Sequence, residues 1–278
     1  MYYSLESGDK ILSLHSPQVM GILNVTPDSF FSGSRIDSIQ ALVDKAGQML
    51  NDGAALLDIG GQSTRPGSTP VSAQEELDRV YPAVEAIRNA FPATWISIDT
   101  YRASVISGCS KLRFDIVNDI SSGEDDKEML NTVLRGGWIY IAMHKQGTPQ
   151  TMQENPVYSE PIQEALFTYF LQKTRHIRKF GIKQIILDPG FGFGKTLDQN
   201  YQLLNRMKRL HGLDVPILVG LSRKSMIYKL LETTPEGALN GSSVLHLVAL
   251  QNGANLLRTH DVKEAVETIK LYNKLREV

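Results

Sequence analysis

The feature that most constrains the fold of this chain is a regular alternation of short apolar runs with longer helical patterns. Eight apolar runs recur, and most are continuously apolar rather than alternating. Continuous runs of this kind are typical of strands that are buried on both faces of a parallel sheet. The predicted strands are Val19–Asn24, Ala55–Gly60, Trp95–Asp99, Ile116–Asp119, Trp138–Met143, Ile185–Asp188, Ile217–Gly220 and Asn255–Arg258.

Amphipathic segments separate these strands. The spacing of their apolar residues predicts helices at Ser38–Asn51, Ala73–Ala90, Pro161–Lys179 and Val262–Leu275. The segment between Asp99 and Ile116 is shorter and has room for a helix of about two to three turns.

Eight strand–helix units in 278 residues give about 35 residues per unit, which is the size expected of a (β/α)8 barrel. We therefore predict an α/β fold in which residues 1–278 form a single (β/α)8 TIM barrel. No linker-like stretch divides the chain. The alternative is a doubly wound open sheet, but the regularity of the repeats favours closure.

Composition excludes several classes of function. The 29 Lys and Arg residues balance 30 Asp and Glu residues, so the chain has no basic footprint for nucleic acid. Its one cysteine, Cys109, forms no intrachain disulfide, which fits a reducing compartment. No stretch approaches the ~18 apolar residues of a membrane span, and the N-terminus lacks a signal-peptide pattern. We expect a cytoplasmic protein that binds neither nucleic acid nor membrane.

Nearly every predicted strand ends in a polar residue followed by a loop. One polar strand end is often a helix cap, but in a barrel all of these ends meet at one rim. Eight of them on one rim predict a binding site. The strand ends are Asn24, Asp58, Asp99, Asn118–Asp119, His144, Asp188, Ser222–Lys224 and Arg258–His260.

The side chains at these ends predict two kinds of ligand. Asp99, Asn118 and Asp188 suit the edge of a flat heterocycle such as a pterin or purine, because a carboxylate can accept two N–H bonds side by side. A cationic set suits an anion, and a phosphate group fits it best. This set consists of Arg65, Lys224, Arg258 and His260.

Two glycine-, proline- and serine-rich loops follow the first and second strands, at Thr26–Ser34 and Gly60–Ser68. Both are longer than typical connections from strand to helix, which favours functional segments over plain surface loops. Asp188–Lys195 is also glycine-rich, but it lacks the spacing of a P-loop. Its glycines would instead allow the backbone to approach a flat ring.

The sequence resembles the dihydropteroate synthase family in two long motifs and five short ones. The long motifs are Gly21–Phe30 (GILNVTPDSF) and Asp58–Gly67 (DIGGQSTRPG). The short ones are Ile98–Thr100, Val117–Ile120, Asp188–Lys195, Ser222–Ser225 and Arg258–Val262. They occur in order from residue 20 to residue 262, over nearly the whole chain.

The resemblance implies a transferase of folate biosynthesis that condenses (7,8-dihydropterin-6-yl)methyl diphosphate with 4-aminobenzoate to 7,8-dihydropteroate and diphosphate. Carried over by motif, the pterin ring would be held by Asp99, Asn118, Asp188 and Lys224, and the diphosphate by Arg65, Arg258 and His260. Asn24 would coordinate Mg²⁺, and the 4-aminobenzoate pocket would comprise Phe30, Thr64, Pro66 and Ser222. The catalytic set would be Lys224, Arg65, Asp99, Arg258 and His260. The resemblance also implies a homodimer and a sulfonamide target.

The chain departs from the family pattern at a few positions. Gln62 stands where the family usually has Glu, and Lys145 stands where it usually has Met. Phe31 and Ser32 replace a pair that often contains Asp, and the run Gly241–His246 is altered. None of these departures removes a residue assigned to chemistry. We expect His144 and His246 to be structural.

Two other functions remain open. A methyltransferase that moves a methyl group from methyltetrahydrofolate to a corrinoid protein would share the barrel and the pterin pocket, but it needs neither a diphosphate site nor an amine pocket. A non-catalytic pterin-binding paralogue should have lost residues that bind Mg²⁺ or the anion. The chain retains both sets, which favours the synthase.

Overall fold

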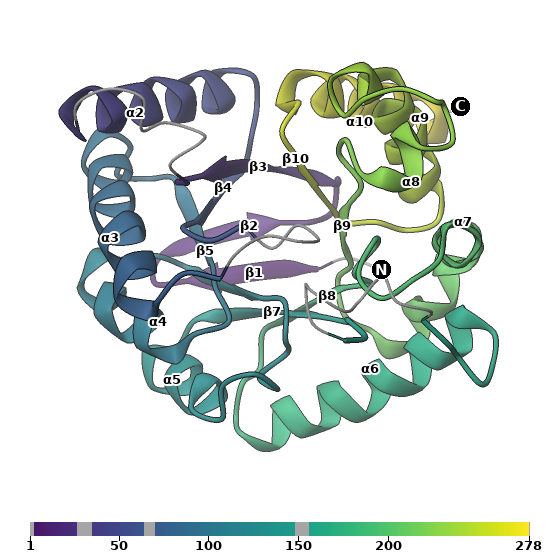
Figure 1. Ribbon diagram of the computed structural model, residues 1–278, viewed down its shortest axis with the longest axis horizontal. Coiled ribbons are helices and arrows are strands. Elements are labelled where there is room, and N and C mark those ends of the chain that lie inside the picture. The colour runs from purple at the N-terminus through teal and green to yellow at the C-terminus, as the bar shows by residue number, and fades with distance from the viewer. Residues whose placement is uncertain (1–2, 27–34, 64–69, 148–155, 278) are drawn as a thin grey trace.

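The computed structural model describes residues 3–26, 35–63, 70–147 and 156–277 (Figure 1). Eight parallel strands form one sheet in the order β8-β7-β6-β5-β4-β3-β10-β9. A parallel bridge between Leu187 and Ile217 joins its two edges, so the sheet closes into a barrel. The strands are β3 (Gln18–Asn24), β4 (Leu56–Gly60), β5 (Trp95–Asp99), β6 (Ile116–Asp119), β7 (Ile139–Met143), β8 (Ile185–Asp188), β9 (Leu218–Gly220) and β10 (Leu256–Thr259).

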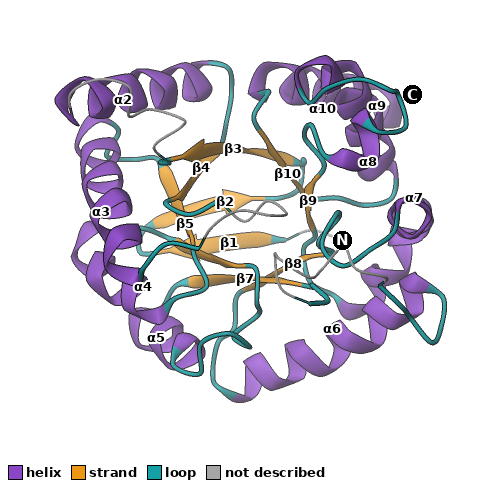
Figure 2. Ribbon diagram, in the orientation of Figure 1, coloured by secondary structure: helices purple, strands orange, loops and turns teal. Residues whose placement is uncertain are grey.

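Helices surround this barrel on the outside (Figure 2). They are α2 (Arg35–Asn51), α3 (Ala73–Ala90), α4 (Ala103–Cys109), α5 (Met129–Gly136), α6 (Ile162–Lys179), α7 (Leu197–Arg206), α8 (Ser225–Tyr228), α9 (Leu239–Gln251) and α10 (Val262–Glu277). The predicted (β/α)8 fold is therefore confirmed, and so is the compressed helix after β5. The predicted strand and helix ends differ from the observed ones by at most three residues.

The structure also contains a hairpin that the sequence analysis missed. Strands β1 (Ser4–Ser7) and β2 (Lys10–Ser13) pair antiparallel around Gly8, which has the positive φ of 59° that a tight turn requires. Leu5 and Leu14 pack against residues near the start of the barrel strands, including Trp95. The hairpin thus closes the N-terminal end of the barrel, where β1 and β2 lie across its middle in Figure 1.

Side chains alternate between the two faces of the barrel wall, and this alternation positions the site. In β4, Leu57 and Ile59 pack against the helices, whereas Leu56 joins the apolar plug inside the barrel. Asp58 lies between Leu57 and Ile59 and therefore points inward. The interior is apolar at the N-terminal end and polar at the C-terminal end.

Candidate active site

The centre of the site is an arginine held between two carboxylates. Arg258 of β10 donates from Nε to Oδ2 of Asp58 at 2.6 Å and from Nη2 to Oδ2 of Asp99 at 2.7 Å. Burial alone would lower the pKa of Arg258, but the two carboxylates hold it above its usual range. Burial raises the pKa of Asp99, and the charge of Arg258 opposes this only in part. Arg258 is therefore a charged guanidinium in a fixed orientation.

Asn118 joins the same group from β6. Its Nδ2 donates to Oδ2 of Asp58 at 3.0 Å, and Asp99 and Asn118 are direct neighbours across the sheet. We call Asp58, Asp99, Asn118 and Arg258 the inner cluster. The sequence placed Asp58 at a strand end but assigned it no role, although it begins one of the two long motifs.

Asp188 and Lys224 lie beside the glycine-rich loop that follows β8. Asp188 accepts a hydrogen bond from the backbone of Gly190 at 2.8 Å, and Lys224 Nζ donates to the carbonyl of Phe191 at 2.5 Å. Burial raises the pKa of Asp188 and lowers the pKa of Lys224 to about 8, and each shift is opposed by the charge of the other residue. The aromatic ring of Phe193 lies 4.9 Å from Lys224 Nζ. A carboxylate and an ammonium group thus face the same space as the inner cluster.

Glycine is required in this loop because of a close approach. Gly190 has a φ of 67°, and a Cβ atom there would lie 1.9 Å from the backbone oxygen of His144. No side chain fits, so the loop can lie directly against the end of β7.

A buried lysine fixes the shape of the same loop. Lys195 Nζ donates to the carbonyls of Gly190 and Phe193 at 2.9 and 3.0 Å, and it lies 3.0 Å from Nδ1 of His144. Burial lowers the pKa of Lys195 to about 7, and in its charged form Lys195 donates to Nδ1 of His144. Burial and the charge of Lys195 lower the pKa of His144 well below its usual value, so this histidine is neutral and structural, as expected. Lys195 was visible in the sequence only as the end of a motif.

The remaining predicted residues divide into two groups. Ser222 and His260 contact each other, with Ser222 Oγ 3.1 Å from His260 Nδ1. Asn24 ends β3 opposite Gly60, at the same end of the barrel. Four predicted residues lie outside the described part of the chain: Phe30, Thr64, Arg65 and Pro66.

A magnesium ion would have few protein ligands here. In the described ranges no group of three or more His, Cys, Asp or Glu side chains could hold a metal. The amide oxygen of Asn24 is the hard type of ligand that Mg²⁺ prefers, and Mg²⁺ commonly keeps several waters and binds substrate phosphates. The residues therefore fit a Mg²⁺ ion that is held mainly by a diphosphate substrate.

The prediction that Asp119 belongs to the polar rim of the barrel is wrong. It points away from the barrel interior, toward the helices, and accepts from Tyr140 Oη at 2.6 Å. It also accepts from Ser121 N and Oγ and from Gly123 N, each at 2.7 Å. We call Asp119, Ser121, Gly123 and Tyr140 the outer cluster. Asp119 is a neighbour of Asn118 in sequence, but alternation along the strand places it on the opposite face.

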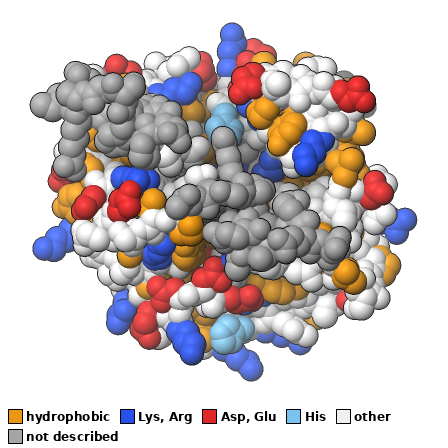
Figure 3. All heavy atoms as spheres, viewed as in Figure 1, with side chains coloured by type: hydrophobic (Ala, Val, Ile, Leu, Met, Phe, Trp, Pro, Cys, Tyr) orange, Lys and Arg blue, Asp and Glu red, His pale blue; other side chains and the backbone are white. Residues whose placement is uncertain are grey.

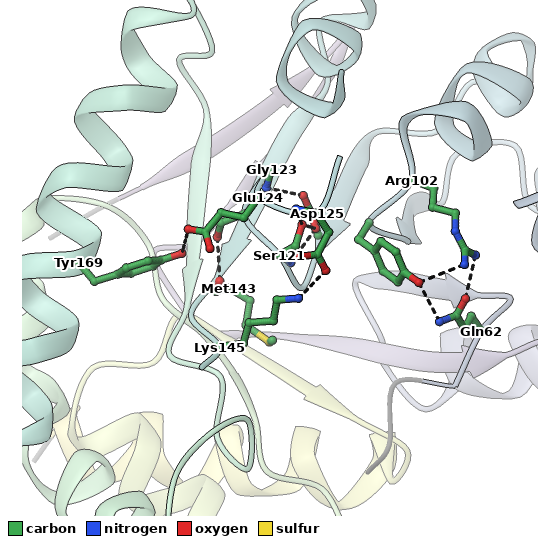
Figure 4. Close-up of polar contacts among 12 residues, drawn as sticks. Gln62, Arg102, Ser121, Gly123, Glu124, Asp125, Met143, Lys145 and Tyr169 are labelled. Atoms are coloured by element: carbon green, nitrogen blue, oxygen red, sulfur yellow. Dashed lines mark hydrogen bonds and ion pairs between the residues drawn. The ribbon is translucent and has the colours of Figure 1, made fainter. Parts of the chain in front are cut away.

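Two of the departures from the family pattern make contacts between loops (Figure 4). Gln62 accepts from Arg102 Nη1 at 2.8 Å and donates from Nε2 to Tyr101 Oη at 3.2 Å. A glutamate carboxylate could make the first contact but could not donate in the second. Lys145 Nζ forms an ion pair with Asp125 at 2.5 Å. Both residues thus connect the loops that surround the C-terminal end of the barrel.

Charge on one face of the molecule is mixed. On the face shown in Figure 3, acidic and basic side chains are interspersed rather than gathered into one basic patch. Within the described ranges no helix has the length and apolar character that crossing a membrane requires.

The closed (β/α)8 barrel defines the class of this protein, an α/β barrel with a polar site at the C-terminal ends of its strands. Residues 20–260 match the family described as pterin binding enzyme. A dihydropteroate synthase of Escherichia coli is 45% identical over 262 residues, which cover 94% of this chain and 92% of the relative.

Solved structures agree with this match. The Yersinia pestis dihydropteroate synthase in a sulfonamide drug complex has a TM-score of 0.92 and 41% identity, covering 99% of this chain and 100% of its own. The Xanthomonas albilineans dihydropteroate synthase with 4-aminobenzoic acid has a TM-score of 0.92 and 35% identity, with 100% of both chains covered. The chain belongs to the dihydropteroate synthase family of pterin-binding enzymes.

Proposed function

We propose that this protein is a transferase of folate biosynthesis that joins (7,8-dihydropterin-6-yl)methyl diphosphate to 4-aminobenzoate, forming 7,8-dihydropteroate and releasing diphosphate. The observation that carries the proposal is the group of carboxylate, amide and cationic side chains, buried or half-buried, at the C-terminal end of the barrel. Relatives of the same fold bind 4-aminobenzoic acid and a sulfonamide drug, which supports the choice of the second substrate.

The pterin ring would lie between β5, β6, β8 and the glycine-rich loop. Asp188 would accept N–H bonds from its guanidine-like edge, and Asn118 and Asp99 would contact the ring nearby. Lys224 would donate to the ring carbonyl. The loop glycines allow the backbone to approach the ring closely, as they do for His144.

The diphosphate would bind at the outer side of the inner cluster. Asp58 and Asp99 occupy Nε and Nη2 of Arg258, whereas Nη1 makes no hydrogen bond with the described residues and could donate to a phosphate oxygen. His260, two residues after Arg258, would also bind the diphosphate, and so would Arg65 of the second long loop. Bound through Asn24, Mg²⁺ would neutralise negative charge on the leaving diphosphate.

The chemistry favours departure of diphosphate before attack by the amine. The nitrogen lone pair of 4-aminobenzoate is drawn into its ring, so this amine is a poor nucleophile. Breaking the C–O bond first leaves a delocalised cation on the pterin methylene. The carboxylates of Asp58, Asp99 and Asp188 would lie near this position and offset the positive charge as it develops. The anilinium product is acidic and needs no dedicated base.

Diphosphate release tests the proposal directly. With Mg²⁺ and both substrates, purified protein should release diphosphate and form dihydropteroate. With the pterin substrate alone we expect slower but measurable release, and strict dependence on 4-aminobenzoate would indicate concerted displacement. Pterin binding without any turnover would favour the non-catalytic paralogue, and methyl transfer from methyltetrahydrofolate would favour the corrinoid-dependent enzyme.

We also propose a cytoplasmic homodimer that sulfonamides inhibit. The lone cysteine supports the reducing compartment, and Leu271 and Leu275, exposed on one side of α10, offer an apolar surface to a second copy. Sulfonamides would compete with 4-aminobenzoate beside Ser222. Light scattering and competition kinetics measure the two properties.

A further inference from the structure

One buried carboxylate lies between the residues proposed to hold the ring and those proposed to hold the diphosphate. Asp58 is fully buried, with 0% of its surface exposed. Its Oδ2 accepts from Nε of Arg258 at 2.6 Å and from Nδ2 of Asn118 at 3.0 Å. One oxygen atom of Asp58 thus contacts Asn118, proposed to hold the ring, and Arg258, proposed to hold the diphosphate.

The other half of this carboxylate is left without a partner. Oδ1 of Asp58 is buried and takes no hydrogen bond from the described residues. A buried carboxylate that served stability alone would be expected to have both oxygens satisfied, as those of Asp119 are. An unpaired buried acceptor costs stability, so the benefit of Asp58 must lie in what Oδ2 holds in place.

Because a carboxylate only accepts hydrogen bonds, Oδ2 determines how both neighbours are turned. Asn118 must direct its amide nitrogen toward Asp58, which leaves its carbonyl oxygen to accept from a ligand. Arg258 is held at Nε by Asp58 and at Nη2 by Asp99, so the plane of its guanidinium group is fixed. Its remaining nitrogen, Nη1, is thereby directed by the same two contacts.

We propose that Asp58 is a positioning residue that couples ring binding to diphosphate binding. It orients the Asn118 amide and the Arg258 guanidinium together, so the ring and the leaving group are held in one geometry around the bond that breaks. This inference rests on the proposed function. It predicts that loss of the Asp58 carboxylate weakens two ligands that contact different residues.

The variant Asp58→Asn tests this coupling, because it keeps the side-chain size and removes the acceptor-only group. Calorimetry with 6-hydroxymethyl-7,8-dihydropterin measures ring binding, and inorganic diphosphate with Mg²⁺ measures anion binding. We expect Asp58→Asn to raise both Kd values by about tenfold. The matched control is Asp119→Asn, a buried carboxylate of the outer cluster. It should lower the Tm but change neither Kd by more than about twofold.

Double variants distinguish coupling from general loosening. In an Asn118→Ala background, Asp58→Asn should have little further effect on the ring ligand and should still weaken diphosphate. In an Arg258→Lys background, Asp58→Asn should have little further effect on diphosphate and should still weaken the ring ligand. Additive effects on both ligands in both backgrounds would overturn the proposal, and so would an Asp58→Asn protein that loses only thermal stability.

Arg258→Lys provides the test if Asp58→Asn does not fold. This variant leaves Asp58 in place but removes its contact with Nε, so Asp58 is itself held less firmly and orients the Asn118 amide less well. Ring binding should therefore weaken too, though less than diphosphate binding. Unchanged ring binding would contradict the coupling. Wild-type protein that binds both ligands without turnover would contradict the proposed function and leave the coupling measurable, whereas wild-type protein that binds neither would overturn both.

Discussion

Two neighbouring residues on β6 belong to two different polar clusters. Asn118 faces the barrel interior and joins the inner cluster, and Asp119 faces the helices and anchors the outer cluster. The outer cluster contains one carboxylate, which accepts from a phenol, a hydroxyl and two backbone amides. The inner cluster contains two carboxylates around one guanidinium, and Oδ1 of Asp58 has no partner among the residues the structure describes.

The difference teaches how to tell a structural polar group from a functional one when both are buried. Burial raises the pKa of Asp119, but its hydrogen bonds from Tyr140 and Ser121 favour the charged form, so the group is internally satisfied. The inner cluster holds two carboxylates and a guanidinium group close together, and Nη1 of Arg258 makes no hydrogen bond with the described residues. This arrangement costs stability and leaves a donor for a ligand. Substitutions in the two clusters should therefore affect different measurements.

The largest effect on ligand binding should come from Asp188→Ala. Asp188 faces the same space as the inner cluster and would accept two hydrogen bonds from the ring. Its removal should weaken binding of 6-hydroxymethyl-7,8-dihydropterin by about 3 kcal/mol or more, roughly a hundredfold in Kd. Calorimetry measures the change, and Asp188→Asn is the isosteric control. Unchanged affinity in Asp188→Ala would show that the ring lies elsewhere.

Lys224→Met should produce a smaller loss, with a characteristic pH dependence. In the wild-type protein, ring affinity should fall as the pH rises past about 8, because Lys224 then loses its proton. The variant should bind about tenfold more weakly at neutral pH and show less of this fall. Titrations of Kd against pH in both proteins test the assignment.

The same lysine should affect stability with the opposite sign. Its pKa is lowered from 10.5 to about 8 in the folded protein, so the unfolded chain binds more protons between these values. The free energy of unfolding should therefore rise with pH across that window in the wild type. Lys224→Met should flatten the rise and be more stable near neutral pH, which urea denaturation measures. An equally steep rise in the variant would contradict the burial of a charged Lys224.

Tyr140→Phe should affect stability without affecting binding. The variant removes one of the donors to Asp119, which should cost about 1 to 2 kcal/mol of unfolding free energy. The affinity for the ring ligand should stay within about twofold of the wild type, because the outer cluster lies on the other face of β6. A matching loss of ring affinity would show that the two clusters are not independent.

The smallest effect should come from the ion pair between Lys145 and Asp125, whose carboxylate is 37% exposed. Partly exposed pairs of this kind contribute less than about 1 kcal/mol. A double-mutant cycle with Lys145→Met and Asp125→Asn should give a coupling below this value, decreasing as salt is added. A larger, salt-independent coupling would assign this loop contact to the site itself.

The sequence alone determined the repeating plan of the protein. Continuous apolar runs predicted the eight strands, because a parallel strand covered on both faces contains few polar residues. The types of the strand-end residues predicted a ring site, and the structure brings Asp99, Asn118, Asp188, Lys224 and Arg258 together. The N-terminal hairpin was missed because each of its strands has only four residues and includes polar ones.

Only the tertiary structure decided which polar groups meet. Alternation along β6 puts Asn118 and Asp119 on opposite faces, but a local pattern does not say which face is the barrel interior. Asp58 and Arg258 are 200 residues apart in sequence, and His144 and Lys195 are 51 apart. These contacts form because the last strand, β10, pairs with β3, whose other neighbour is β4, and because the loop after β8 packs onto the end of β7. No local sequence pattern contains that information, since closure is a property of all eight strands together.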